Sequence, residues 1–422
     1  MRYLTPWRSS QECDMAKGME KHYFDHAATT RCHSDVAEEF YRYSVEHFGN
    51  PSSLHDYGLD AESGLLQART FFAQVFDTRP RQIVFTGSGT EANNLALQGI
   101  ALQQWVEDQQ HSNSDLERKK IRRNLVISAT EHPAVTQTAR SLEAFGFEVR
   151  AIPTNAQGKI TLQTVQKLID DQTLLVSIMK VNNITGIIHP VESIFQALKN
   201  QNPKLICHSD WIQAFGKIPA KDDLDTLDLI SISAHKVHGP KGVGALVIKN
   251  KTILDQNRIR PLIFGGGQEQ GLRAGTPNPG LIQAFHLAAK KSLSQQASFI
   301  EHTRALKDSF CEKLKPWIER GKIVLNSPKD SDTCPHILNL SFPDISGRTM
   351  ADQLNRKNCL VSTGSACSSN KKVLDATLCA MGLDEDRIHS AIRISFDLEN
   401  TNEDVSTLVK AVNDILRERH EQ

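Results

Sequence analysis

The chain has 422 residues, with 49 Lys and Arg against 49 Asp and Glu, so its formal charge is zero. This length favours a large domain with a smaller one. The balanced charge gives no net field for nucleic acid or an anionic membrane, and the apolar runs are far shorter than the roughly 20 residues of a membrane span. Eight cysteines without a CxxC pair indicate reduced thiols in a cytoplasmic protein.

Short apolar runs alternate with amphipathic helical patterns from Arg81 to about Gly280. This alternation predicts an α/β domain with a mainly parallel sheet of seven strands. The predicted strands are 83–85, 125–127, 148–152, 174–178, 205–207, 229–232 and 244–248, and two of the predicted helices are 136–145 and 162–169.

The remaining segments suggest how the chain is divided. Residues 1–22 lack an apolar signal core and are expected to form a flexible N-terminal extension. The polar stretch 107–123 is expected to be a solvated surface excursion. A long helical pattern from 279 to about 314 is predicted to lead into a smaller α+β domain, with strands at 337–342 and 392–396 and a helix at 402–418. We therefore expect a large domain at 23–285, a contribution of its N-terminal segment to the small domain, and a small domain at 286–422.

A glycine-rich turn, Gly87-Ser88-Gly89-Thr90, follows the first strand and begins a helix. Glycines let the backbone approach an anion, and the first amides of a helix have no partner within it. The turn is therefore a candidate phosphate cup, although similar turns also serve as plain strand–helix connections.

Two further polar residues follow predicted strands. His132, after the strand at 125–127, could lie on an aromatic ring and shuttle protons, but alone it would be read as a helix-start histidine. Asn183, in the loop after the strand at 174–178, offers an amide to a cofactor or substrate.

The most informative residue is Lys236, in the motif Ser233-Ala234-His235-Lys236. Lysine forms imines only where its charge is suppressed. Enzymes that use pyridoxal 5'-phosphate (PLP) hold it on such a lysine and pair its pyridinium nitrogen with an acid. Asp210, followed by Gln213, stands 26 residues earlier and could be that acid, while Ser233 and His235 add a second set of phosphate contacts.

Two later loops complete the pattern. The first, 265–277, is glycine-rich and carries the hydroxyl of Thr276. The second places Cys367 among Gly364, serines and Asn370, a composition that would let a thiol move.

These motifs together closely resemble the cysteine desulfurases of the NifS/IscS type, within the class V, fold-type I PLP enzymes. The resemblance covers roughly residues 22–418. It rests on 23–30, 48–53, the cup at 86–91, 130–132, 181–183, Asp210-x-x-Gln213, Ser233-x-His235-Lys236, 265–269 and Gly364-Ser365-Ala366-Cys367.

The resemblance implies a homodimer that desulfurates L-cysteine. Alanine would be released, and Cys367 would keep a persulfide for an acceptor such as an iron–sulfur scaffold or a tRNA-thiolation protein. The implied catalytic residues are Cys367, Lys236 and His132. The implied PLP contacts are Gly89, Thr90, His132, Asn183, Asp210, Gln213, Ser233, His235, Lys236 and, from the neighbouring subunit, Thr276. Arg393, Asn50 and Asn183 would bind the substrate, and no metal is expected.

Three positions depart from the family pattern: Ile184 replaces an acidic residue, Trp211 follows the pyridinium-binding acid, and Phe396-Asp397-Leu398 replaces Leu/Val-Gly-Arg. The last change makes the carboxylate end of the site less positive. The alternatives are a selenocysteine lyase, another PLP enzyme such as a transaminase in which Cys367 is dispensable, and a PLP-binding scaffold with weak activity.

Overall fold

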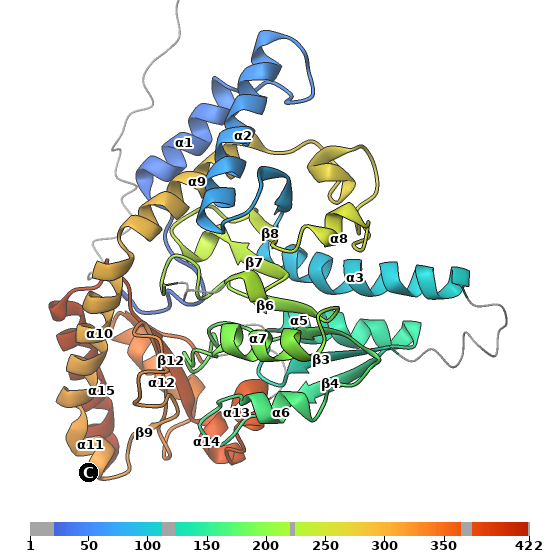
Figure 1. Ribbon diagram of the computed structural model, residues 1–422. Helices are drawn as coiled ribbons and strands as arrows, with labels where there is room; N and C mark the ends of the chain where they lie inside the picture. Colours follow the sequence, from blue (N-terminus) through green and yellow to red (C-terminus); the bar gives the residue numbers. More distant parts are fainter. Residues whose placement is uncertain (1–20, 112–122, 220–223, 364–373, 421–422) are drawn as a thin grey trace, which may run out of the picture.

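A computed structural model of the chain describes residues 21–111, 123–219, 224–363 and 374–420 (Figure 1). Its centre is a seven-stranded sheet with the order β2-β8-β7-β6-β5-β3-β4, in which only β8 runs antiparallel to its neighbours. The strands are β2 (Ile83–Thr86), β3 (Asn124–Ser128), β4 (Glu148–Ile152), β5 (Thr173–Ser177), β6 (Ile206–Asp210), β7 (Leu229–Ser233) and β8 (Gly244–Ile248).

Helices cover both faces of this sheet, which explains why most of its strands are continuous apolar runs. The core on one face includes residues of α2 (Asp56–Val75), α7 (Val191–Gln201) and α9 (Pro279–Ser294). The core on the other face includes residues of α3 (Gly89–His111) and α5 (Pro133–Ser141). The remaining helices of this part are α1 (Ser34–Val45), α6 (Leu162–Gln166) and α8 (Thr252–Asp255).

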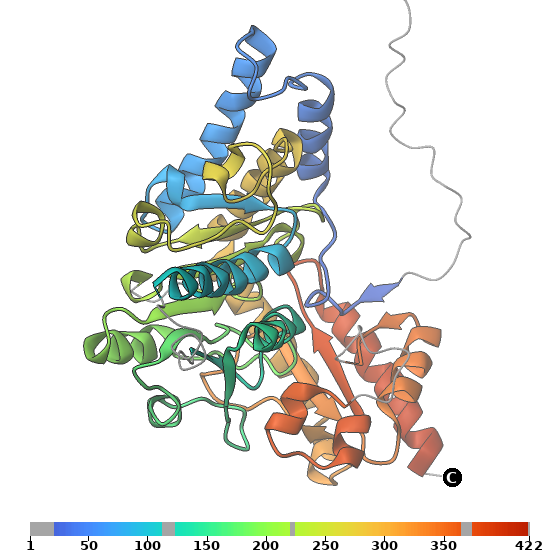
Figure 2. The same ribbon diagram turned by 90° about the vertical axis from the view of Figure 1, so that its right-hand side faces the viewer.

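A second hydrophobic core lies below the sheet in Figure 1 and surrounds the three-stranded sheet β12-β10-β9. Its strands are β9 (Val324–Leu325), β10 (Ile337–Ser341) and β12 (Ala391–Ser395), and a parallel pair joins β1 (His22–Tyr23) to β11 (Cys359–Leu360). The helices are α10 (Gln296–Lys313), α11 (Lys315–Glu319), α12 (Gly347–Arg356), α13 (Ala376–Ala380), α14 (Glu385–His389) and α15 (Asn402–His420). Figure 2 shows the N-terminal strand lying against this part of the molecule.

The seven predicted strands are all present, and so are the two later ones and the C-terminal helix. Three expectations need correction. The pattern at 279–314 is two helices that meet at Gln295. The polar stretch 107–123 begins as helix, since α3 continues to His111. Residue 22 belongs to a strand and not to a flexible extension. Residues 1–20 and 112–122 lie outside the described part, and the domain boundary at 285/286 stays a prediction.

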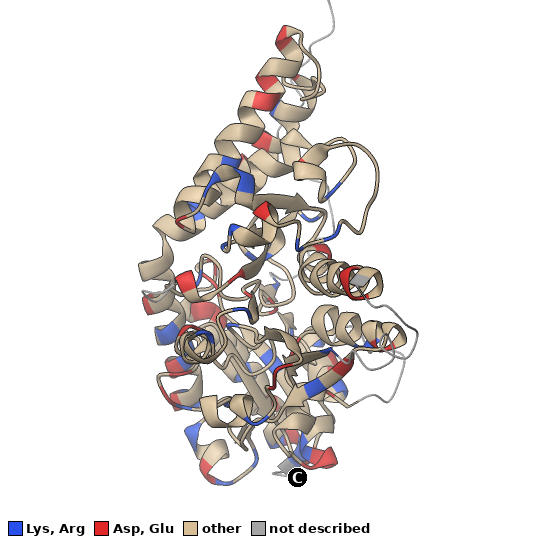
Figure 3. Cartoon of the chain, turned by 45° about the vertical axis from the view of Figure 1, so that its right-hand side comes forward, with Lys and Arg blue, Asp and Glu red and all other residues tan. Residues whose placement is uncertain are grey.

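The charged residues are intermixed in sign along the ribbon in the view of Figure 3. No helix among the described residues is long and apolar enough to cross a bilayer.

Candidate active site

The strands β2, β3, β5, β6 and β7 point the same way, so their carboxyl ends meet at one edge of the sheet. Ligands of such sheets bind beyond this edge. The cup, His132, Asn183, Asp210 and Ser233 lie at or after these strand ends, which places them on the same side of the molecule.

The glycine-rich turn forms the N-terminus of α3. Ser88 caps the helix by accepting the amide of Glu91 at 3.1 Å through its hydroxyl. Among the described residues, nothing is bound to the amides of Gly89 and Thr90. A Cβ on Gly89 would lie 2.3 Å from Cδ1 of Ile212, so only glycine lets the turn pack this closely. The helix therefore presents unpaired donors suited to a phosphate.

The turn that follows β7 carries Ser233, His235 and Lys236. Ser233 is buried, and Nδ1 of His235 lies 3.3 Å from the Thr29 hydroxyl. Burial, and then the charge of Lys236, lowers the pKa of His235 to about 3, so this imidazole is neutral. A neutral ring next to a buried hydroxyl can contribute hydrogen bonds to an anion held by the cup.

The amine of Lys236 donates to the carbonyls of Ala27 and Ala28, both at 2.7 Å. Burial lowers its pKa from 10.5 to about 7, and the positive charges of Lys217 and Arg393 add to the effect. A neutral amine is the nucleophilic form of lysine, so this side chain is prepared to attack a carbonyl near neutral pH.

Asp210 lies at the end of β6 and is 3% exposed. Its carboxylate accepts the amide of Asn93 at 2.7 Å and the backbone N–H of Ile212 at 2.8 Å. Burial raises the pKa of Asp210 against the effect of these donors and of His132. A cationic ring nitrogen would stabilise the charged form of this acid.

Gln213 and His132 both lie near Lys236. The Gln213 side chain donates to the carbonyl of Ala27 at 2.8 Å, and its buried Oε1 has no partner among the described residues. His132 caps α5, where its Nδ1 accepts the amide of Ala134 at 3.1 Å. Burial lowers the pKa of His132, while Asp210 opposes that shift.

Arg393, in the middle of β12, is 3% exposed. One terminal nitrogen donates to the Asn183 carbonyl at 2.9 Å, and the other donates to the Asp25 carboxylate at 2.7 Å. Its buried Nε has no partner among the described residues. Asp25 thus fixes the guanidinium while leaving one edge for a substrate carboxylate.

The structure does not bring every predicted residue into this group. Asn50 is exposed in the loop between α1 and α2, where its Oδ1 accepts the amide of Ser52 at 3.0 Å. Thr276 is also exposed. Thr90 is exposed too, but it belongs to the cup at the start of α3. Cys367 lies outside the described residues.

The loop that bears Thr276 is tied to helix α2 by an ion pair and to strand β2 by a hydrogen bond. The Glu269 carboxylate accepts both terminal nitrogens of Arg69, at 2.6 and 2.9 Å, and the amide of Phe85 at 2.8 Å. Glu269 and Gln270 both adopt left-handed backbone conformations, with φ of 49° and 58°, which non-glycine residues adopt only at a cost in energy.

Sequence reasoning missed three residues of this site. Asn93 lies one helical turn beyond Gly89 and so faces the same way, a signal the motif contained. Asp25 lies within the matched stretch 23–30, and its partner Arg393 is 368 positions away. Glu131 accepts the amide of Met179 at 2.6 Å, and burial, with the charge of Asp210, raises its pKa well above the usual value.

Two of the three positions that depart from the family pattern, Ile184 and Trp211, lie in hydrophobic cores. The Trp211 indole is 3% exposed and packs in the large core near Phe76. Ile184 is buried against Leu378 and Met381 of the short helix α13 and its following turn.

PLP fits the residues present. The cup has unpaired amides at a position where a Cβ would not fit, the lysine has a lowered pKa, and the buried acid lacks a full cationic partner. The unpaired Oε1 of Gln213 adds a polar group at the same place.

Comparison with known proteins shows the family to which the chain belongs. The aminotransferase class-V family matches residues 22–408. A putative cysteine desulfurase IscS 1 of Bacillus subtilis is 35% identical over 401 residues, covering 94% of this chain and 99% of the relative. The cysteine desulfurase IscS of Rickettsia africae is 36% identical over 92% of this chain and 90% of the relative.

A solved structure of a NifS-like protein has a TM-score of 0.83 and 34% identity, and the match covers 94% of this chain and 99% of that one. Sequence, fold and site geometry lead to the same assignment. The chain belongs to the class-V aminotransferase family, among the cysteine desulfurases of the NifS/IscS type.

Proposed function

We propose that this enzyme uses PLP, held on Lys236, to remove sulfur from L-cysteine and to place it on Cys367. The observation that carries the proposal is the buried amine of Lys236, whose pKa is lowered to about 7 and which interacts electrostatically with the buried acid Asp210 and the guanidinium of Arg393. When bound, PLP withdraws electrons from the substrate α-carbon. The chain supplies the positions and protons for the rest of the reaction.

In this proposal Lys236 takes the α-proton, since its amine is substantially neutral near pH 7. For bound PLP, Asp210 would keep the ring nitrogen protonated, Gln213 would donate to the ring oxygen, and His132 would serve as a proton shuttle. Gly89, Thr90, Ser233 and His235 would hold the phosphate.

The substrate carboxylate would bind the free edge of Arg393, near Asn183. The Cys367 thiolate then attacks the substrate sulfur. A sulfur–sulfur bond forms as the bond between that sulfur and Cβ breaks. After proton return the products are alanine and a persulfide on Cys367, which passes its outer sulfur to an acceptor protein in the cytoplasm, such as an iron–sulfur scaffold or a tRNA-thiolation protein.

The proposal includes a homodimer, because two predicted site residues, Asn50 and Thr276, are exposed in the single chain. Large apolar side chains near Asn50 and Thr276 in the sequence are exposed: Tyr41, Phe48, Leu54, Tyr57, Leu59 and Phe264 are each at least 48% exposed. Exposed large apolar side chains of this kind are typical of an interface when they form a patch. A second copy would cover them and bring Thr276 to the neighbouring phosphate site.

The test is to add L-cysteine and a reductant to the PLP-loaded protein and to quantify alanine and sulfide together. We expect equal amounts of both from the wild type. Cys367→Ala should keep the visible absorption of lysine-bound PLP but release no sulfide. Full sulfide release by Cys367→Ala would refute the persulfide step, and failure of the wild type to bind PLP would refute the whole proposal.

A further inference from the structure

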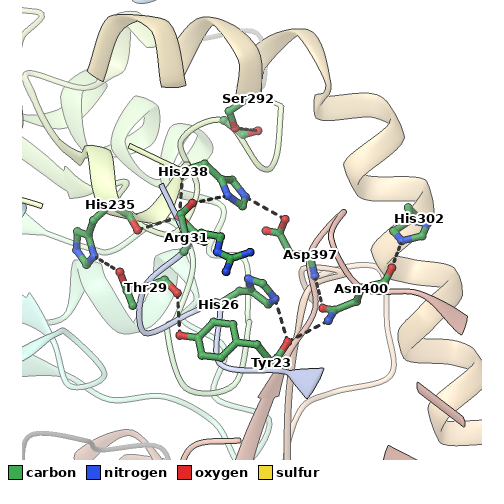
Figure 4. Close-up of polar contacts among 12 residues, drawn as sticks. Tyr23, His26, Thr29, Arg31, His235, His238, Ser292, His302, Asp397 and Asn400 are labelled. Carbon is green, nitrogen blue, oxygen red and sulfur yellow. Dashed lines mark hydrogen bonds and ion pairs between the residues drawn. The ribbon is translucent and has the colours of Figure 1, made fainter. Parts of the chain in front are cut away.

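The third departure, Asp397, forms an ion pair that connects two parts of the active site. Its Oδ1 lies 2.9 Å from Nε2 of His238, and the two side chains are 2% and 12% exposed. His238 is two residues beyond Lys236, and Asp397 is four residues beyond Arg393. The pair therefore joins the turn that carries Lys236 directly to the residues that follow β12, the strand of Arg393. Figure 4 shows the contact between His238 and Asp397.

The hydrogen bonds of His238 show that the ring is a cation. Nε2 faces the Asp397 carboxylate, and Nδ1 lies 2.9 Å from the Arg31 carbonyl. Both partners only accept hydrogen bonds, so both ring nitrogens carry protons. Burial alone would lower the pKa of His238, but Asp397 outweighs it and raises the pKa above 6.5. Burial would raise the pKa of Asp397, but His238 holds it well below its usual value.

A metal ion would be another use of these side chains, since ligand atoms of His33, His238 and Glu399 lie within 4.8 Å of one another. The two imidazole rings, however, are stacked, with centroids 4.2 Å apart and planes within 7°. Imidazole binds a metal in the plane of its ring, and one ion cannot lie in two separate parallel planes. The arrangement instead suits a protonated His238 stacked on a neutral His33, whose pKa is lowered by burial and by His238.

The segment from Tyr23 to Arg31 provides an indirect link between the same two parts. Ser395 of β12 accepts the amide of Ala27 at 2.9 Å. Thr30 donates its amide to the His235 carbonyl at 3.0 Å and accepts the amide of His238 at 2.8 Å. The His238–Asp397 ion pair links the same two parts by a direct contact.

Packing alone does not fix the distance between the lysine turn and the residues after β12, because a cavity of about 160 Å³ lies beside the ion pair. It extends between the helices α9 and α10, the lysine turn and the residues after β12, and its lining includes Lys217, Ser292, Phe299 and Glu399. Side chains around such a space can adjust, whereas an ion pair sets a definite distance.

We propose that the His238–Asp397 ion pair is a positioning device that holds the amine of Lys236 and the guanidinium of Arg393 at the separation the reaction needs. The catalytic part of this proposal rests on the proposed desulfurase function. A structural measurement therefore accompanies the kinetic one.

The test compares Asp397→Asn with Asp404→Asn. Asp404 pairs with His22 at 2.5 Å, so it offers a second His–Asp pair that does not reach the lysine turn. We expect Asp397→Asn to lower kcat/KM for cysteine by about 10- to 100-fold, the scale of a misplaced catalytic group. Asp404→Asn should stay within about twofold of the wild type. Asp397→Glu should recover part of the loss.

Dependence on pH separates positioning from general damage. The pair needs a charged His238, so it is present below the raised pKa of that ring and is lost as pH rises through it. The ratio of wild-type to Asp397→Asn activity should therefore fall towards one at alkaline pH. The charged and titratable groups around the ring are Asp397, Glu399, His33, His26, Lys217 and Lys236.

Amide hydrogen exchange, measured without substrate, tests whether loss of the ion pair loosens the two segments that it joins. Asp397→Asn should speed exchange in peptides covering 234–239 and 391–397, and Asp404→Asn should not. If Asp397→Asn does not fold, His238→Gln breaks the pair from the other side. Unchanged exchange with unchanged kinetics would overturn the proposal, as would an equal effect of Asp404→Asn. A wild type without desulfurase activity but with the expected exchange pattern would refute the function and keep the positioning role.

Discussion

The lowered pKa of Lys236 leads to a quantitative prediction. A pKa of about 7 leaves half of the amine neutral at pH 7, against roughly one part in 3,000 for an ordinary lysine. The second cause of the shift, after burial, is the charge of Lys217, whose own pKa falls only to about 8, so that it remains mostly charged at pH 7. Replacing Lys217 by methionine should therefore raise the pKa of Lys236, by on the order of one pH unit.

The assay is acylation of Lys236 in the PLP-free protein by an amine-reactive reagent, followed over pH and read by peptide mass spectrometry. Limited access slows the labelling but does not move its midpoint. We expect a midpoint near pH 7 in the wild type and a higher one in Lys217→Met. Lys159→Met, which removes a partly buried lysine paired with Asp330 and Asp332, should match the wild type. A wild-type midpoint near 10, or the same midpoint in Lys217→Met and the wild type, would refute the reasoning.

Three further predictions concern the cup, the substrate clamp and the core. Gly89→Ala should weaken PLP binding in a spectroscopic titration by about tenfold or more, because its Cβ would meet Ile212, whereas Gly267→Ala, with open space around it, should bind normally. Arg393→Lys should raise the KM for cysteine about tenfold or more, since the planar fork is lost; an unchanged KM would exclude Arg393 as the clamp. Phe72→Ala should lower the free energy of unfolding in urea by about 3–5 kcal/mol, because Phe72 is fully buried, and a loss below 1 kcal/mol would contradict that packing.

The sequence predicted the sheet well because its strands are buried on both faces and so appear as apolar runs. An apolar run does not reveal the direction of its strand, so the antiparallel orientation of β8 is visible only in the structure. The break between α9 and α10 was missed for a related reason. It occurs at Gln295, without a glycine or proline to mark it, and the apolar pattern continues across it.

Site residues were predictable where one short motif carried them, as with Asp210, Gln213 and Lys236. Residues that act through distant partners were not, and the Asp25–Arg393 pair is an example. The orientation of Trp211 could not be read from its neighbour in the chain, since the direction of a side chain after a strand end depends on the core that receives it. Thr276 and Asn50 remain predictions that depend on a second chain.

The twisted backbone at Glu269 and Gln270 has a consequence for assembly. Because Arg69 holds this unfavourable shape within the single chain, the segment leading to Thr276 has little freedom left to lose in the proposed homodimer. Freeing the segment by replacing Arg69 would leave its sequence intact, yet association would then have to order it, and the proposed homodimer would dissociate at higher protein concentration.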